Sequence, residues 1–168
     1  HIVCSFAKSA AVGGKDIAFT DTENYKYTSN PCFHMNSSDT TVGGWASSYM
    51  RQTICSQFKN AMPSDLQAVL RSRTIYTDNT GGRDLNNSSY VTATTDYVYL
   101  PSEFEVRGLY SYANSYEKNY QQQLAYYKNG ASKIRYKSDD TSTAAWLWVR
   151  STSCYFDRSF CAVYTDGS

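Results

Sequence analysis

The chain has 168 residues, 41% of them hydrophobic, and a formal net charge of +1 at neutral pH. A chain of this length is most simply one domain, which buries roughly 70% of its unfolded surface and folds without cross-links. The small net charge creates no overall field that would attract nucleic acid, and no apolar run approaches the ~20 residues that cross a bilayer. We therefore expect a single domain over residues 1–168, with no nucleic-acid partner and no membrane insertion. Because the chain begins at His1 rather than Met, we also expect it to be a piece of a longer protein.

Residues 1–35 hold the weakest pattern, with short apolar stretches between Gly and Pro breaks that indicate two or three short strands. A polar loop follows at 36–44, and an amphipathic helix is predicted from near Trp45 to Pro63. The residues that recur at intervals of four along its buried stripe are Ala46, Met50, Ile54 and Phe58.

The next stretch predicts a second short helix and then a strand. Ser64 and Gln67 have capping-box spacing, and Leu66, Val69 and Leu70 would form the buried face of a helix. Residues 73–77 favour a strand, and the polar segment 78–89 favours a loop.

The second half of the chain alternates strands, short helices and long loops. Residues 97–100 predict a strand, and a helix of one or two turns is predicted to start at Ser102 and end at Gly108. A Tyr, Ser and Asn loop at 109–119 precedes a helix over 121–128. After a loop at 138–143, strands are predicted at 146–151 and at 160–165. The fold class is therefore α+β, with two or three short helices and long loops.

Tyrosine is the unusual feature of the composition, with 16 Tyr against 7 Phe and 3 Trp. Tyrosine offers a large rigid contact area with a hydroxyl group, and Ser and Asn add adaptable hydrogen bonds, as in binding loops. Strand-rich domains also favour Tyr. Composition alone leaves both interpretations open.

Five cysteines form an odd set without a C-x-x-C pair or the spacing of a zinc site. Cys32 and His34 would supply only two metal ligands, so we expect no metal and no cofactor. The pattern is more typical of a reducing compartment than of a secreted disulfide scaffold, and whether any two cysteines pair stays open.

Known catalytic motifs are missing from the sequence. We find no nucleophile elbow, no phosphate-binding glycine loop and no zinc-protease helix. A Cys32–His34 nucleophile pair lacks an orienting partner, and Glu103 and Glu105 at a helix start more simply favour the helix dipole. We expect a protein that is not an enzyme, with no catalytic residues.

The terminal segment, residues 146–168, carries the strongest signal for function. An aromatic strand leads into a polar and aromatic stretch that resembles a recognition surface, and a second strand follows. Trp148 and Arg150 are two apart, so a strand places both on one face. We favour a structural role for Arg150, in which it holds a loop carbonyl or a carboxylate beneath the segment. The alternative is direct contact with a ligand.

A series of motifs in chain order gives a resemblance to a known family. They are Asn36-Ser-Ser-Asp-Thr, Gly43-Gly44-Trp45 with Met50-Arg51, Leu100-Pro-Ser-Glu-Phe-Glu, Ala125-Tyr-Tyr-Lys, Trp148-Val-Arg150-Ser151 and Phe160-Cys to Asp166-Gly167. Over roughly residues 35–168 they resemble an uncharacterised bacterial and phage domain with a G-G-W helix start and a W-W-x-R-S-P block. That domain is similar to C-type-lectin-like folds, and some members look like the variable proteins of diversity-generating retroelements.

The resemblance implies a twisted antiparallel sheet with flanking helices and an exposed, variable surface that recognises a ligand. The implied ligand-binding residues are Thr152, Ser153, Cys154, Tyr155, Phe156, Asp157 and Ser159. Their implied structural frame is Trp148, Arg150 and Ser151. The implied function is recognition or adhesion, as in phage receptor-binding or bacterial surface proteins, through a protein or glycan receptor on another cell. The implied location is a phage virion or bacterial cell surface. A parent protein that contains this domain could form a homo-oligomer. The alternative is a non-catalytic structural domain of a virion or cell-wall protein.

The chain departs from the family pattern in several places. Leu147 and Thr152 stand where Trp and Pro are usual, and no calcium-dependent sugar-binding triplet is present. Asp166-Gly167 is a hairpin-turn signal, and the resemblance implies closing strands beyond it. We therefore expect the sheet to have an edge here that is open or filled by another segment.

Overall fold

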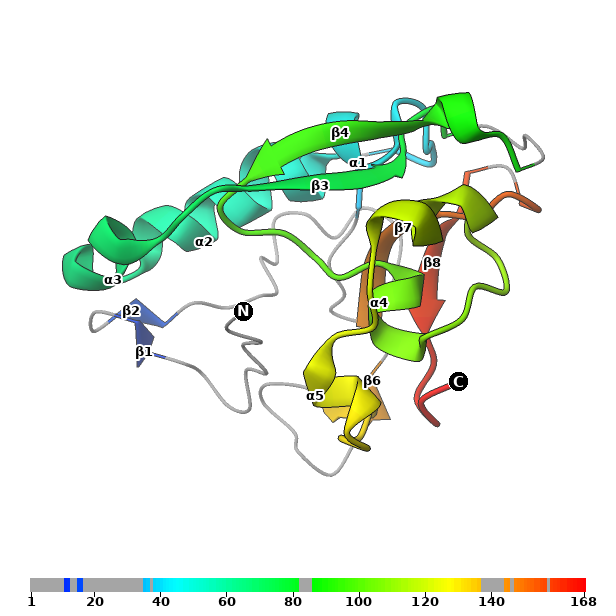
Figure 1. The fold of residues 1–168 in the computed structure, drawn as a ribbon. Helices are drawn as coiled ribbons and strands as arrows, with labels where there is room; N and C mark the ends of the chain where they lie inside the picture. Colours follow the sequence, from blue (N-terminus) through cyan, green and yellow to red (C-terminus); the bar gives the residue numbers. More distant parts are fainter. Residues whose placement is uncertain are drawn as a thin grey trace.

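The computed structural model describes residues 11–12, 15–16, 35–36, 38–81, 86–136, 144–145, 147–156 and 158–168. These residues form an α+β fold of short helices and antiparallel strand pairs, which confirms the predicted fold class (Figure 1). The four pairs are β1 (Ala11–Val12) with β2 (Lys15–Asp16), β3 (Arg73–Asp78) with β4 (Val91–Asp96), β5 (Arg135–Tyr136) with β6 (Ala144–Ala145), and β7 (Leu147–Thr152) with β8 (Phe160–Val163). Within this described part, no helix is long and apolar enough to span a membrane.

The helix predicted from Trp45 is present, but it is broken into three pieces. They are α1 (Gly44–Ser47), a π-helical turn η2 (Met50–Ile54) and α2 (Cys55–Ala61). The break falls at Ser48, whose hydroxyl donates to the Trp45 carbonyl at 2.9 Å and accepts the Arg51 N–H at 3.1 Å. Such side-chain bonds compete with the backbone bonds of a regular helix.

The buried stripe of this helix is confirmed at three of its four positions. Met50, Ile54 and Phe58 are buried, whereas Ala46 is half-buried, and Trp45 instead is completely enclosed. The break at Ser48 changes the helical phase, so positions before and after it do not share one face.

The second predicted helix exists as α3 (Ser64–Val69), but its predicted cap and buried face are wrong. Pro63 is the N-cap residue, no side chain caps the helix, and Val69 is 65% exposed. The Gln67 side chain donates instead to the Met62 carbonyl at 2.8 Å. α3 lies away from β7 and β8 (Figure 1), and Leu66 and Leu70 are only half-buried there, so the face is partly covered at most.

The strand predicted at 73–77 is confirmed as β3, whereas the strand predicted at 97–100 is wrong. The partner of β3 is β4, in a register that pairs Ile75 with Thr94. No prediction covers the residues of β4, whose β-branched threonines suit a strand with one exposed face. The carbonyls of Leu100 and Pro101 do not join a sheet, because both accept hydrogen bonds from Arg150.

The predicted helix after Pro101 is confirmed as α4 (Glu103–Arg107). Ser102 and Glu105 form the predicted capping box, and Gly108 ends the helix with a φ of 72°. The segment that follows differs from prediction. A 3-10 helix, η4 (Ser115–Tyr120), stands within the predicted loop, and α5 (Ala125–Lys128) is shorter than the predicted helix over 121–128. A second 3-10 turn, η3 (Ser88–Tyr90), precedes β4.

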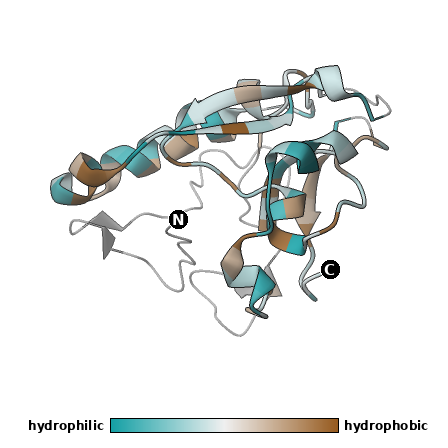
Figure 2. Ribbon diagram, in the orientation of Figure 1, coloured by the Kyte–Doolittle hydropathy of each residue, from teal (hydrophilic) through white to brown (hydrophobic). Residues whose placement is uncertain are grey.

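The predicted terminal strands are confirmed as the antiparallel pair β7–β8, which separates two hydrophobic clusters. Trp148 and Phe160 face a cluster with Trp45, Met50 and Ile54, and Val149, Cys161 and Val163 face a cluster with Val106 and Tyr127. Figure 2 shows hydrophobic residues in brown in the middle of β3, in α4 and in this pair, whereas β4 is mostly near white, which marks intermediate hydropathy. The segment that connects β7 to β8 therefore projects from a pair that lies between the two clusters.

A turn follows β8, as Asp166-Gly167 predicted. The Gly167 N–H donates to the Tyr164 carbonyl at 2.9 Å, and Gly167 has a φ of 85°. In the described part of the chain, β8 has β7 as its sheet neighbour, and the expectation that its other edge is open or filled by another segment stays a prediction.

Candidate functional site

The segment between β7 and β8 divides into a buried base and an exposed tip. Thr152, Ser153 and Cys154 are at most 6% exposed, whereas Tyr155 and Phe156 are 52% and 57% exposed. Ser159 is also exposed, and Asp157 lies outside the described residues. The three buried residues therefore offer little surface to a ligand, although Ser153 contributes to the wall of a neighbouring pocket, whereas the resemblance implied an exposed face. The exposed part of the predicted site is its aromatic tip and Ser159.

Hydrogen bonds from the buried base fix the shape of the tip. The Ser153 hydroxyl accepts the N–H groups of Tyr155 and Phe156, each at 3.2 Å, and the Ser153 N–H donates to the Ser159 carbonyl at 2.9 Å. Arg158 has a φ of 67°, a strained conformation for a residue other than glycine. The loop thus holds two aromatic side chains outward on a bonded turn.

A third exposed ring joins the tip from a segment that sequence analysis did not select. Tyr112, which is 43% exposed, lies between α4 and η4. Its ring centroid is 6.3 Å from that of Tyr155, edge to face, and 6.3 Å from that of Phe156. The Cys154 N–H donates to the Tyr112 carbonyl at 2.8 Å, so backbone and rings connect the two segments. We call Tyr112, Tyr155 and Phe156 the aromatic cluster.

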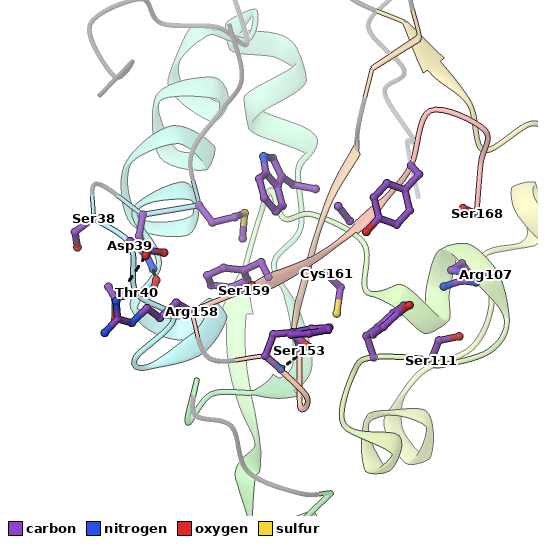
Figure 3. Close-up of a pocket in the computed structure, with 18 residues that line it drawn as sticks. Ser38, Asp39, Thr40, Arg107, Ser111, Ser153, Arg158, Ser159, Cys161 and Ser168 are labelled. Atoms are coloured by element: carbon purple, nitrogen blue, oxygen red, sulfur yellow. Dashed lines mark hydrogen bonds and ion pairs between the residues drawn. The ribbon is translucent and has the colours of Figure 1, made fainter. Parts of the chain in front are cut away.

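A pocket of about 870 Å³ runs beside β8 from this cluster, within the size range of ligand sites. The Ser38–Thr40 side chains lie at one end of it, near Arg158, and Arg107 and Ser111 lie at the other (Figure 3). Its wall also includes Tyr112, Trp148, Phe156 and Tyr164. The lining is rich in hydroxyl groups and aromatic rings.

The charged groups of the pocket occur as opposite pairs. Arg158 faces Asp39 at 3.7 Å across an exposed contact, and Arg107 binds Glu103 at 3.0 Å. The exposed Arg158–Asp39 pair contributes little to stability, whereas the Arg107–Glu103 pair is largely shielded from solvent. The pairing leaves a nearly neutral pocket, which does not favour a highly charged ligand.

Arg150 has the structural role that the sequence favoured. Its side chain is fully buried, and Nη1 donates to the Leu100 carbonyl at 2.8 Å and to Glu105 Oε2 at 2.6 Å. Nη2 reaches Glu105 Oε1 at 3.1 Å, and Nε donates to the Thr77 hydroxyl at 3.0 Å. The Arg150 guanidinium therefore joins β7 to three other parts of the fold, which are β3, the segment before α4 and the capping residue Glu105 of α4.

The aromatic ring beside the Arg150 guanidinium comes from outside β7. The guanidinium lies over the Tyr99 ring at 5.6 Å. Trp148 instead packs against the first hydrophobic cluster and lines the pocket, since an irregularity in pairing follows it along β7.

Ser151, the third frame residue, connects the strand to buried carboxylates. Its hydroxyl donates to Glu117 Oε2 at 2.7 Å and accepts the Glu103 N–H at 3.2 Å. The Asp78 N–H donates to Glu117 Oε1 at 2.9 Å. Burial nevertheless raises the pKa of Glu117 to about 7, against the opposing effect of these bonds and of the Arg150 charge.

A second buried carboxylate explains the Gly43-Gly44-Trp45 motif. Asp96 accepts the Trp45 indole N–H at 3.1 Å and the Arg51 Nε–H at 2.7 Å. Gly44 has a φ of 52°, and a Cβ there would lie 2.4 Å from the Asp78 carbonyl. The motif therefore packs α1 closely against the β3–β4 hairpin and has no role in the pocket.

The cysteines do not offer a reactive thiolate in the described part of the chain. Cys55, Cys154 and Cys161 are free and buried. Burial raises the pKa of the Cys161 thiol, although it lines the pocket, and raises that of Cys55 to about 12. Among these residues no group of three acidic, Cys or His side chains is placed to hold a metal. Cys4, Cys32 and His34 lie outside them.

Sequence reasoning missed the contribution of Tyr112 and of the loop at Asp39. Both come from segments far from residue 152, and a repeated Tyr/Ser/Asn composition gives no indication of which tyrosine is near the tip. The capping box at Ser102 was a usable signal for one residue near the tip. It places Glu103 at the start of α4, and the Glu103 carboxylate accepts the N–H of Tyr112.

The fold and site thus define an α+β domain that exposes an aromatic cluster beside a polar pocket. The family model described as a domain of unknown function (DUF6273) matches residues 22–168, and the chain belongs to that family. Searches of curated proteins and of solved structures gave no match.

Proposed function

We propose that the protein is a ligand-binding module for recognition or adhesion, and that it binds through the tip of the segment between β7 and β8. The observation that carries this proposal is the exposure of Tyr155 and Phe156 on a turn fixed by Ser153. Rigid exposed aromatic side chains are costly in solubility and characteristic of binding surfaces. Their position beside a pocket gives a ligand both rings and hydroxyl groups to contact.

The finer fold that we propose is C-type-lectin-like, with the surface variable among relatives as in proteins of diversity-generating retroelements. In support, the Trp148, Arg150 and Ser151 frame lies directly beneath the tip and is tied to the rest of the domain by buried bonds. A surface built on such a frame tolerates substitutions, because the tip residues contribute little to the core. The proposed setting is a phage virion or a bacterial cell surface, with a protein or glycan receptor on another cell.

An enzymatic function has less support. Nucleophilic catalysis needs an activated group in a pocket, and the described pocket offers a protonated buried thiol and charged groups already paired. A purely structural domain has one observation in its favour, which is the burial of Thr152, Ser153 and Cys154. On that alternative the exposed rings would pack against a neighbouring virion or wall subunit.

The proposal is tested by screening the purified chain against arrays of glycans and of cell-surface ectodomains. We expect the wild-type chain to bind a defined subset, and a Tyr155→Ala/Phe156→Ala variant with unchanged folding to lose that binding. Binding that is equal for both proteins would contradict the proposal. The genomic neighbourhood gives a second test, since variable proteins require a nearby reverse transcriptase and a near-copy of the coding sequence for 152–159. A fixed sequence at these positions across many close relatives would contradict the variable surface.

A further inference from the structure

We propose that Tyr112 belongs to the same recognition surface as Tyr155 and Phe156, that Glu103 positions it, and that the surface receives a protein partner. The inference rests on the proposed function and names residues and a partner class for that site. It starts from the contact of the Tyr112 ring with the rings of Tyr155 and of Phe156, which lie about forty residues later in the chain.

Glu103 holds the segment that carries Tyr112. The carboxylate is buried, and its Oε2 accepts the N–H groups of Tyr112 at 3.2 Å and of Ala113 at 2.9 Å. The Ser111 N–H approaches both carboxylate oxygens at 3.1 Å, and Arg107 binds Oε1 at 3.0 Å. Three consecutive backbone donors therefore converge on one side chain. This arrangement fixes the direction in which Tyr112 leaves the backbone.

The same segment is joined to the recognition tip. Ala113 and Ser153 form an antiparallel bridge, and the Tyr112 carbonyl accepts both the Cys154 N–H at 2.8 Å and the Cys154 thiol at 3.0 Å. The Glu103 N–H also donates to the Ser151 hydroxyl beneath the tip. One carboxylate thus sets the position of the Tyr112 ring relative to Tyr155 and Phe156.

The partner class follows from the arrangement of apolar and polar groups. Three rings that are 43–57% exposed form the centre, and Arg158, Asp39 and Ser159 lie toward the rim. An aromatic centre with a polar rim is the anatomy of a protein interface, and tyrosine is enriched among the residues that dominate binding energy there. The near-neutral pairing of Arg158 and Asp39 disfavours a polyanionic ligand.

The test uses a phage-displayed library of random linear dodecapeptides as the probe, because protein-binding surfaces select peptides. We expect selected peptides to bind the wild-type chain, and Tyr112→Ala to weaken the binding about tenfold or more, as for a central interface residue. Tyr97→Ala is the matched control, since Tyr97 is 48% exposed and lies at the end of β4, beside Lys59 of α2. Glu103→Ala should weaken binding in the wild-type background but have little further effect in a Tyr112→Ala background. Glu103→Gln, which keeps one acceptor oxygen, should restore part of the loss.

Three results would overturn the inference. Tyr112→Ala with unchanged affinity, while Tyr155→Ala and Phe156→Ala lose binding, would remove Tyr112 from the surface and leave the proposed function intact. Equal losses for Glu103→Ala with and without Tyr112 would mean that Glu103 does not act through that ring. Binding to a glycan array with no peptide selected would reject the partner class. If none of the three aromatic substitutions affects any binding, the proposed function itself fails.

Should Glu103→Ala not fold, the Glu103→Gln variant and the same double-mutant comparison decide the positioning role.

Discussion

Replacing Glu117 with Gln should change how the stability of the domain depends on pH. The Glu117 carboxyl is 1% exposed, and its pKa in the folded protein is about 7, against an ordinary value of 4.5. Burial, which disfavours the charged form, is the largest cause. Because the folded state holds this proton more tightly than the unfolded chain, folding is favoured below pH 4.5 and loses stability as the pH rises to about 7.

The size of the effect follows from the two pKa values. Each pH unit between them corresponds to about 1.4 kcal/mol, so ionising Glu117 costs the folded state about 3 kcal/mol at pH 8. The amide side chain of the Glu117→Gln variant cannot ionise. The free energy of unfolding of this variant, minus that of the wild type, should therefore increase by that amount between pH 4.5 and 7 and be level above it.

Urea unfolding from pH 4 to pH 8, followed by both fluorescence and circular dichroism, measures this difference. A constant offset is expected as well, because the introduced amide has donors where Ser151 and Gln121 already donate. Only the pH-dependent part tests the reasoning, and it should persist at high salt since the group is buried. A difference that is independent of pH would refute it. A difference that decreases toward neutral pH would show that Arg150 and the hydrogen bonds outweigh burial.

Two further substitutions test the frame. Arg150→Met should lower the free energy of unfolding by about 3–5 kcal/mol in urea titrations, because Glu105 would be left buried without its charged partner, and a loss below about 1 kcal/mol would mean that the clamp is unimportant. Trp45→Phe should cost about 1–3 kcal/mol through loss of the indole bond to Asp96, and a thermal scan that shows no change would contradict that bond.

The sequence predicted those parts of the fold whose signals are local. The capping box at Ser102 and the glycine at 108 depend on neighbouring residues and were found where predicted, and the terminal strands were found with slightly different ends. The stripe of Met50, Ile54 and Phe58 was also found, because helical periodicity repeats over several turns.

The failed predictions involve competition between local pattern and distant contacts. Residues 97–100 have the composition of a strand, yet the Leu100 carbonyl is bound by Arg150, fifty residues later. The helix after Pro63 has an apolar side, but Val69 is 65% exposed and no described element packs over it. Neither result can be predicted from a few neighbouring residues in the sequence.

The candidate site was predicted in outline only. The exposure of Tyr155 and Phe156 and the role of Arg150 agree with the sequence analysis, whereas the burial of Thr152 through Cys154 does not. An irregularity in β7 and the bridge from Ala113 to Ser153 extend the buried frame past Ser151. Such pairing depends on tertiary register, which residue types alone do not specify.

The most direct test of the account is the affinity of a ligand found in the array screen for two matched double variants. One is Tyr155→Ala/Phe156→Ala, and the other is Val69→Ala/Tyr97→Ala, which also removes two exposed apolar side chains but from α3 and the end of β4. With unfolding free energies measured in parallel, we predict a loss of at least about tenfold in affinity for the first variant and less than about twofold for the second. Equal affinities for both variants, with both folded, would contradict recognition through the aromatic tip.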